Sequence, residues 1–290
     1  MSRHRYRVVD VFTERPLEGN PLAVFPDAAG ISGDLMQRIA RELNLSETVF
    51  VLPAENPEHA AALRIFTPAR ELVFAGHPTV GAAFVLLEEG AVPQGQEQFL
   101  LEEKIGPVPV RVEAGQRPLI WLRTPAIAFG RTWERAVCAQ ALGLQSGDLL
   151  PIDPQLVSAG NPTVFIPLKN REAVDRAFLE VQGLRGLKGE DPQAICIFVF
   201  TPTPEGAYSR MFAPEHGIVE DPATGSSTGP LAAYMLRHGL VAEERRRRFL
   251  SEQGTKMGRR SILHIQVSDE TRGIEVGGFV TPIAEATMEL

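Results

Sequence analysis

Three ionisable side chains occupy positions from which they could move a proton: Glu47 in LSETVFV, His77 in FAGHPTVG and Asp221 in VEDPATGSS. Glu47 opens the apolar run TVFVL, and burial of its carboxyl group there would raise its pKa toward the working pH of a general acid or base. His77 or Asp221 could then decide in which protonation state the glutamate rests. Residues of these types favour proton transfer by a carboxylate.

Two segments of the chain have nearly the same pattern of glycine and apolar residues. They are FAGHPTVGAAFVLLEEGAV at residues 74–92 and ATGSSTGPLAAYMLRHGLV at residues 223–241. Each is apolar almost all round, which predicts a helix that is buried on every side. Pro78 favours a helix start just after His77, and the late glycine of each segment is typical of a helix end. Aligned without gaps, the segments share Gly76/Gly225, Thr79/Thr228, Ala83/Ala232, Leu87/Leu236, Gly90/Gly239 and Val92/Val241.

The glycine at the start of each predicted helix indicates an anion-binding position. A helix start presents unpaired N–H groups and a partial positive charge, and glycine lets a ligand approach the backbone closely. If the two halves face each other, the starts at Gly76 and Gly225 could hold one substrate carboxylate between them, beside His77 and Ser226.

Two further landmarks precede each predicted helix and indicate an internal duplication. An Arg-x-Phe-x-Pro run lies at residues 64–68 and again at 210–214. A Gly-Asn-Pro triplet opens a strand-like run at Gly19 and again at Gly160. Three landmarks in the same order favour two related domains over chance similarity.

Strand-like alternation fills most of the chain between these landmarks. The pattern predicts an α+β fold of two pseudo-symmetric domains, each a curved sheet or barrel wrapped around a central apolar helix. We expect one domain over residues 1–122, which could also receive the last strand at about 280–290, and a second over residues 123–290. An amphipathic helix is expected at 33–44. The strand-like runs are 5–12, 47–52, 62–68, 107–113 and 119–124, then 163–168, 194–200, 262–268 and 274–280.

Composition excludes several kinds of partner. The chain has 290 residues and a net charge of −7, which argues against a nucleic acid or an anionic membrane as the main partner. Neither a signal-peptide pattern nor a window of membrane-spanning length is present. Cys138 and Cys196 lie in apolar surroundings without metal-ligand spacing, which predicts buried free thiols, no metal site and a cytoplasmic location.

Five segments, in this order and over nearly the whole chain, resemble the PhzF-like phenazine-biosynthesis isomerase family, which has the diaminopimelate-epimerase-like fold. The resemblance implies two similar domains with an active site in the cleft between them. It also implies a homodimer, a small carboxylic acid as substrate, and no metal or organic cofactor. The segments are VDVFTERPLEGNPLAVF, LNLSETVFV, RIFTPARELVFAGHPTVGAA, EDPATGSSTGPLAAY and EQGTKMGR.

The family's functional positions can be carried over onto the matching residues of this chain. Glu47 matches the family's general acid/base. The resemblance therefore implies an isomerase that moves a proton by carboxylate catalysis. The other matching positions are the polar groups His77, Asp221 and Ser226 around the substrate, the backbone donors Gly76 and Gly225, and the weaker binding candidates Asn20 and Gln253.

One departure from related enzymes narrows the chemistry. Relatives that racemise amino acids carry a cysteine just before each helix-start glycine, where this chain has Ala75 and Thr224. Neither side chain can deprotonate a carbon acid near neutral pH, so an epimerase that uses two thiols is excluded.

Simpler interpretations stay open for each residue. Glu47 could be a solvated carboxylate at a strand edge, and His77 or Ser226 could only cap a helix. Asp221 before proline is also typical of an ordinary turn. Any of these would leave the residue without a catalytic role.

Two other functions also stay open. The paired helix starts would serve a non-catalytic protein that binds a small acid. Residues 225–229 match Gly-x-Ser-x-Gly, which would make Ser227 the nucleophile of a hydrolase. That match is weak, because two acids and a proline precede the glycine where the motif needs a buried strand.

Overall fold

The chain forms two compact units of strands and helices. The structure, a computed structural model, describes residues 2–268 and 273–290. The first unit comprises Met1–Arg123 together with Glu275–Leu290, and the second comprises Thr124–Ile274. The last strand of the chain therefore belongs to the same unit as the first strand.

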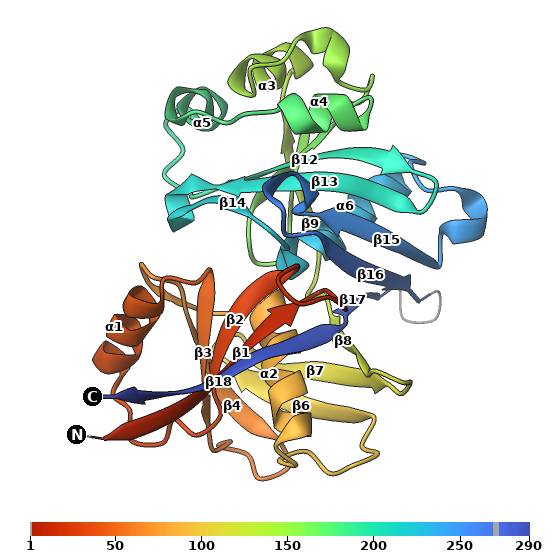
Figure 1. Ribbon diagram of the computed structural model, residues 1–290. Helices are drawn as coiled ribbons and strands as arrows, with labels where there is room; N and C mark the ends of the chain where they lie inside the picture. The colour runs from red at the N-terminus through yellow and green to blue at the C-terminus, as the bar shows by residue number, and fades with distance from the viewer. Residues whose placement is uncertain (1, 269–272) are drawn as a thin grey trace. The chain divides into compact units, whose positions relative to one another are not determined.

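The strands of the first unit form one continuous sheet that curls around a helix (Figure 1). The pairing runs β18–β1–β2–β3–β4–β6–β7–β8–β17, parallel for β2/β3 and β4/β6 and antiparallel elsewhere. The short β5 adds to β4. The strands are β1 (Arg3–Val11), β2 (Asn20–Phe25), β3 (Glu47–Leu52), β4 (Ala61–Phe66), β5 (Glu71–Leu72), β6 (Gln98–Glu103), β7 (Gly106–Glu113), β8 (Leu119–Arg123), β17 (Ile274–Gly278) and β18 (Val280–Glu289).

Helix α2 (Gly76–Glu88) is the central helix of this unit. It contacts β1, β2, β3, β8 and β18, and its residues 76–86 are all buried. The expected start after His77 is wrong, because the helix begins at Gly76 and takes Pro78 into its first turn. Proline is tolerated there since the first N–H groups of a helix have no partner within the helix. Gly90, at φ +71°, ends the helix as the sequence predicts.

Helix α1 (Gly33–Leu43) covers the opposite face of β3 and β4. Ser32 caps its start and Asn44, in the left-handed conformation, ends it. Met36 and Ile39 pack on Phe25, Phe50 and Phe66. This confirms the amphipathic helix expected at 33–44.

The second unit repeats the sheet of the first around helix α6 (Gly225–Arg237). Its strands pair in the order β9–β10–β11–β12–β13–β15–β16, parallel for β11/β12 and β13/β15. This is the order of β18–β1–β2–β3–β4–β6–β7, so the topology confirms the duplication. The strands are β9 (Ala128–Thr132), β10 (Gln155–Ser158), β11 (Thr163–Pro167), β12 (Cys196–Thr203), β13 (Gly206–Ala213), β14 (Ile218–Asp221), β15 (Arg248–Gln253) and β16 (Ser261–Val267).

Alternate residues of β12 divide the core of the second unit into two layers. Phe198 and Phe200 pack toward α6, whereas Ile197 and Val199 pack toward a group of short helices at the other face (Figure 1). The sequence did not reveal these helices. They are α3 (Arg135–Ala141), α4 (Arg171–Arg176) and α5 (Val181–Lys188), with 3-10 turns at Ser146–Asp148, Pro214–His216, Glu243–Arg245 and Thr255–Met257.

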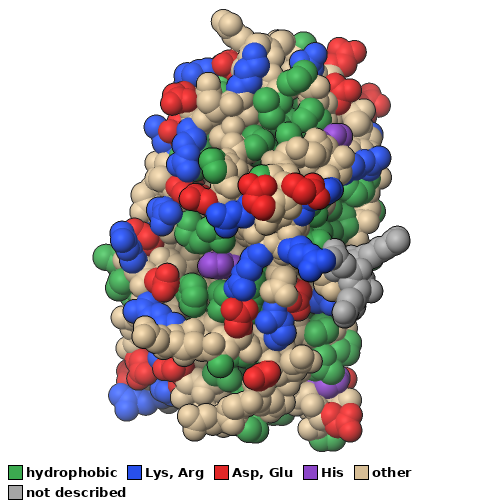
Figure 2. Space-filling view, turned by 90° about the vertical axis from the view of Figure 1, so that its right-hand side faces the viewer, with side chains coloured by type: hydrophobic (Ala, Val, Ile, Leu, Met, Phe, Trp, Pro, Cys, Tyr) green, Lys and Arg blue, Asp and Glu red, His purple; other side chains and the backbone are tan. Residues whose placement is uncertain are grey.

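Two expectations from composition can be compared with the structure. Cys138 and Cys196 are both buried and free, as predicted. Among the described residues, no helix has the length and apolar character needed to cross a membrane. On the face shown in Figure 2, acidic and basic side chains are interspersed. That nucleic acid is not the main partner stays a prediction.

Candidate active site

Glu47, His77 and Asn20 lie together at the start of α2. Asn20 opens β2 and Glu47 opens β3, and the parallel register that pairs Leu22 with Glu47 brings the two strand starts to the same edge of the sheet. His77 reaches them from the first turn of the helix. Sheet pairing and the helix start therefore assemble this cluster from three distant parts of the sequence.

The cluster is linked through the imidazole ring. The amide nitrogen of Asn20 lies 3.3 Å from His77 Nδ1, and His77 Nε2 lies 3.3 Å from Glu47 Oε2. Asn20 is fully buried, His77 is 4% exposed and Glu47 is 8% exposed. The simpler interpretation of Glu47 as a solvated carboxylate is therefore wrong.

Burial decides the charge of the imidazole. It lowers the pKa of His77 to about 3, so the ring is neutral near pH 7. The contact with Glu47 would be an ion pair only if His77 were protonated, and the complete burial of the ring disfavours that form. An amide N–H of Asn20 that points at Nδ1 assigns the ring proton to Nε2, which faces Glu47.

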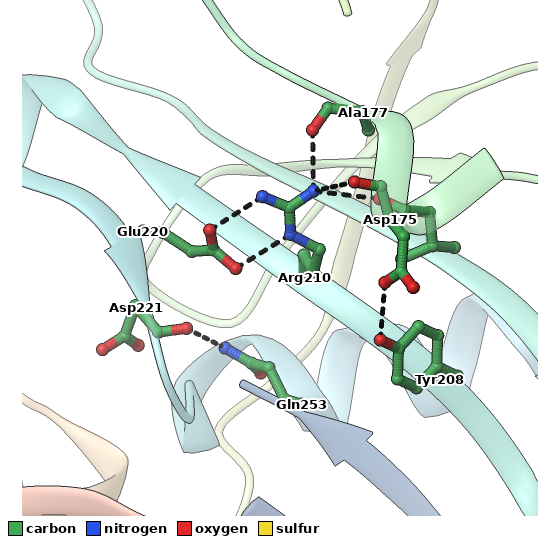
Figure 3. A network of polar contacts seen from close by, with 8 residues as sticks. Asp175, Ala177, Tyr208, Arg210, Glu220, Asp221 and Gln253 are labelled. Carbon is green, nitrogen blue, oxygen red and sulfur yellow. Dashed lines mark hydrogen bonds and ion pairs between the residues drawn. The ribbon is translucent and has the colours of Figure 1, made fainter. Parts of the chain in front are cut away.

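Asp221 and Gln253 form a second cluster at the start of α6. The Asp221 carboxylate accepts a hydrogen bond from the Thr224 hydroxyl. Gln253 Nε2 donates to the Asp221 carbonyl oxygen at 2.7 Å and to Thr224 Oγ1 at 3.0 Å, while its Oε1 accepts from the Thr224 N–H at 3.2 Å. Figure 3 shows the Gln253 contact with the Asp221 backbone. The side chain and the backbone of Asp221 are therefore both held by hydrogen bonds.

Ser226 occupies the position in α6 that His77 occupies in α2. Its Oγ lies 3.2 Å from the Asn161 amide nitrogen, which donates to it. Asn161 belongs to the second Gly-Asn-Pro triplet, as Asn20 belongs to the first. Each unit therefore holds the first turn of its central helix by an asparagine.

Gly76 and Gly225 are the first residues of α2 and α6. The residues that precede them, Ala75 and Thr224, make no side-chain hydrogen bond that caps the helix. The first-turn N–H groups are therefore not covered by a preceding side chain, which is the arrangement that suits a bound anion.

Ser227 cannot be the nucleophile of a hydrolase. Its side chain is fully buried in α6, and its Oγ lies 2.9 Å from the Thr163 hydroxyl. A nucleophilic serine needs a base within hydrogen-bond reach and access to substrate, and threonine is no base. The Gly-x-Ser-x-Gly match is therefore incidental.

The arginine of each Arg-x-Phe-x-Pro run holds the strand that leads to the helix start. Arg210 binds Glu220 through two hydrogen bonds of 2.9 and 2.8 Å, and Arg64 binds Glu71 at 2.7 and 2.9 Å. Arg210 also donates to the backbone carbonyls at the end of α4 (Figure 3). We call the Arg210–Glu220 pair, together with the carbonyls that Arg210 binds, the Arg210 clamp. Because Glu220 precedes Asp221 on β14, the Arg210 clamp fixes the strand that carries this candidate catalytic carboxylate.

The described residues contain no group of three or more His, Cys, Asp or Glu side chains that could hold a metal ion. The polar clusters at the two helix starts are carboxyl, imidazole, amide and hydroxyl groups. Such groups bind small polar molecules and transfer protons.

The chain matches the family model described as "Phenazine biosynthesis-like protein" over residues 9–286. It is 36% identical to the trans-2,3-dihydro-3-hydroxyanthranilate isomerase of Pseudomonas aeruginosa, over 97% of this chain and 98% of that protein. It is also 36% identical to an uncharacterized isomerase of Mesorhizobium japonicum, over 99% of both chains.

Solved structures agree with these matches. A phenazine biosynthesis protein of the PhzF family from Bacillus anthracis superimposes with a TM-score of 0.87 at 26% identity, and all of both chains is covered. A probable proline racemase from Agrobacterium radiobacter shares the fold with a TM-score of 0.67, at 14% identity over 99% of this chain and 93% of that one. The chain therefore belongs to the PhzF-like phenazine-biosynthesis family and is an isomerase.

Proposed function

We propose that the protein isomerises a small carboxylic acid by moving a proton within it, with Glu47 as the general acid/base and without a cofactor. The observation that carries this proposal is the buried contact of Glu47 with the neutral imidazole of His77, next to the start of α2. A carboxyl group in such a place can exchange a proton with a bound substrate.

In the proposed mechanism the Glu47 carboxylate removes a proton from a carbon of the substrate, and the electron pair is delocalised along the conjugated system. The carboxylic acid so formed then returns the proton to another carbon, so that substrate and product have the same composition. His77 Nε2 lies 3.3 Å from Glu47 Oε2 without a hydrogen bond between the two atoms, and in the proposed mechanism the ring turns its Nε2–H toward the carboxylate and steadies it between the two steps. Asn20 holds the imidazole in that orientation.

We propose that the two helix starts bind the substrate carboxylate through backbone N–H groups. The support is that neither start is capped by its preceding side chain, and that the same scaffold is built in both units. This requires the starts at Gly76 and Gly225 to meet at one cleft between the units. Asp221 and Ser226 would then contact an amino or hydroxyl substituent, with Gln253 fixing Asp221.

The relatives suggest the class of substrate. A relative is named trans-2,3-dihydro-3-hydroxyanthranilate isomerase, and we propose a cyclic acid with amino or hydroxyl substituents for this chain. A protein that only binds such an acid is the alternative. A buried carboxylate beside a bound anion weakens binding by charge repulsion, so a protein that only bound the acid would gain nothing from Glu47. The presence of Glu47 therefore favours catalysis over binding alone.

The proposal is tested by turnover of trans-2,3-dihydro-3-hydroxyanthranilate and related cyclic acids. Loss of general acid/base catalysis typically costs about 10²–10⁴-fold in rate, and we expect kcat of Glu47→Gln to fall by that factor. Glu42→Gln, on an exposed position of α1, is the matched control and should keep the parent rate. Activity of Glu47→Gln within a few-fold of the parent would remove Glu47 from the mechanism.

We further propose that the protein is a cytoplasmic homodimer. Two buried free thiols suit a reducing compartment, and the dimer follows from the family resemblance. Light scattering after size exclusion measures the dimer directly. A monomer at micromolar concentration would refute that part of the proposal.

A further inference from the structure

Glu103 is a buried carboxyl group that the proposed mechanism does not use. It is the last residue of β6, is 8% exposed and lies beneath the start of α2. Its carboxyl group contacts the Thr79 hydroxyl at 2.5 Å and accepts a hydrogen bond from the N–H of Ala75. Both partners belong to the turn that presents Gly76.

Counting hydrogens at Thr79 indicates which form of Glu103 fits this site. The Thr79 hydroxyl also lies 2.6 Å from the carbonyl oxygen of Ala75, which can only accept. A hydroxyl group has a single hydrogen to donate. If that hydrogen goes to Ala75, the contact between Thr79 and Glu103 needs a hydrogen from Glu103. Both contacts are satisfied at once only when Glu103 is a neutral carboxylic acid.

The second unit has an uncharged residue at the same place. In the parallel pairs β4/β6 and β13/β15, Ala61 lies opposite Leu101 and Ala207 lies opposite Ser251. Ala61 and Ala207 are equivalent positions, because each lies three residues before the arginine of its Arg-x-Phe-x-Pro run. Their partners Leu101 and Ser251 are therefore equivalent too, and so are Glu103 and Gln253, which lie two residues after those partners.

Gln253 contacts the residues that lead into α6, and one of these contacts corresponds directly to a contact of Glu103. Its Oε1 accepts from the N–H of Thr224, the residue before the helix, as the Glu103 carboxyl group accepts from Ala75. Its Nε2 donates to Thr224 Oγ1 and to the Asp221 carbonyl oxygen, whereas Thr228, the counterpart of Thr79, donates to the Thr224 carbonyl oxygen. Gln253 therefore acts as both acceptor and donor without carrying a charge, and a carboxyl group can act as both only when it is protonated.

We propose that Glu103 is a positioning residue that works as a neutral carboxylic acid, and that it fixes the start of α2 in the way Gln253 fixes the start of α6. The structural part of this inference stands alone, and its effect on substrate binding rests on the proposed function. An ionised Glu103 would place a negative charge behind the N–H groups that receive the substrate carboxylate, and it would break the hydrogen-bond pattern at Thr79.

The surroundings of Glu103 favour the neutral form. Burial raises its pKa to about 8, against the opposing effect of its contacts with Thr79 and Ala75. The neighbouring charged groups are engaged with one another or neutral. His77 on α2 is neutral. Arg64 on β4 and Lys104, which follows β6, both bind Glu71 on β5. Glu102 lies on the other face of β6 and binds His59, and Arg111 on β7 lies opposite Gln98 at the far end of β6.

The pH dependence of stability tests the neutral form without any substrate. A carboxyl group with a raised pKa in the folded state contributes stability that is complete below its ordinary pKa of 4.5 and is lost as the pH rises to about 8. Relative to Glu103→Gln, the unfolding equilibrium constant of the parent should rise by roughly a thousandfold across that window, since each pKa unit is tenfold. The parent should also show an infrared band of a protonated carboxylic acid that Glu103→Gln lacks.

Glu102→Gln is the matched control for this measurement. Hydrogen bonds from the N–H groups of Asn56 and Glu55 lower the pKa of Glu102, so its stabilisation is lost as the pH falls, in the opposite direction. A constant difference in stability between the parent and Glu103→Gln from pH 5 to pH 9, or an unchanged infrared band, would overturn the proposal.

Activity separates positioning from mere structure. We expect the KM of the parent to rise above pH 8. Glu103→Gln should keep kcat near pH 7 and lack that rise, whereas Glu103→Ala should raise KM at every pH. A parallel alkaline rise of KM in the parent and in Glu103→Gln would refute the positioning role. That result would leave the role of Glu47 untouched, because Glu47→Gln is judged on kcat.

Discussion

The duplicated arginines offer a comparison within one molecule, since Arg64 and Arg210 have the same place in the repeat but different surroundings. The Arg210 side chain is 8% exposed and pairs with a Glu220 side chain that is 14% exposed. Its Nη1 donates to the carbonyls of Val174, Asp175 and Ala177 at 3.0, 3.1 and 2.7 Å. Replacing Arg210 by methionine would leave a buried carboxylate and three carbonyl oxygens without this donor.

The magnitude follows from burial. Removing one partner of a buried ion pair costs about 3–5 kcal/mol, because the other charge stays buried without compensation. The Arg64 side chain is 31% exposed, and Lys104 would still bind Glu71 at 2.6 Å after its removal. An ion pair that solvent reaches contributes about 1 kcal/mol or less. We therefore expect Arg210→Met to lower the free energy of unfolding by at least about 2 kcal/mol more than Arg64→Met.

Urea denaturation followed by far-UV circular dichroism measures both variants, with the parent slope as a check on two-state unfolding. Figure 3 shows that Arg210 binds Glu220, which precedes Asp221 on β14. Arg210→Met should therefore also reduce kcat. Arg64→Met should reduce kcat less, because Arg64 on β4 binds a glutamate on β5 and neither strand carries Glu47 or His77. Equal losses of stability in the two variants would refute the reasoning from burial.

Other predictions concern packing and the excluded nucleophile. A Cβ atom at Gly81 would lie 2.4 Å from Leu22 Cδ2, so Gly81→Ala should destabilise by about 1–2 kcal/mol in thermal melts. Gly186→Ala, where the added atom meets open space in α5, should instead stabilise by about 0.5–1 kcal/mol, and a loss there would contradict the packing argument. Tyr234→Phe removes a 3.0 Å hydrogen bond to the Asp153 carbonyl and should cost about 1–2 kcal/mol; an unchanged melting temperature would count against it. Ser227→Ala should keep kcat. A hundredfold loss of kcat would contradict the conclusion that Ser227 is not a nucleophile.

Much of the fold follows from patterns that the sequence displays locally. Helix α1 has one apolar face and residues at both ends that cap it, and the two central helices are apolar all round. Strand β9 could not be found in this way, because all of its residues are exposed and show no alternation. The short helices α3, α4 and α5 span too few turns for a periodic signal.

The candidate site was only partly visible before the strands were paired. Glu47, His77 and Asn20 stood out by type and by the repeated landmarks, and the structure brings them into contact. Asn161 could have been identified through the second Gly-Asn-Pro triplet. The equivalence of Glu103 and Gln253 depends on strand register, which no local pattern of the sequence reveals.

The most direct test of the account is the exchange of substrate hydrogen with solvent. With trans-2,3-dihydro-3-hydroxyanthranilate in D₂O, the parent enzyme should place deuterium on a carbon of the product, since a Glu47 carboxyl group that takes up a proton can exchange it between the two steps. Glu47→Gln should place no deuterium on that carbon when the same fraction of the protein has substrate bound. Deuterium appearing at that carbon equally fast with Glu47→Gln would contradict the claim that this carboxyl group moves the proton.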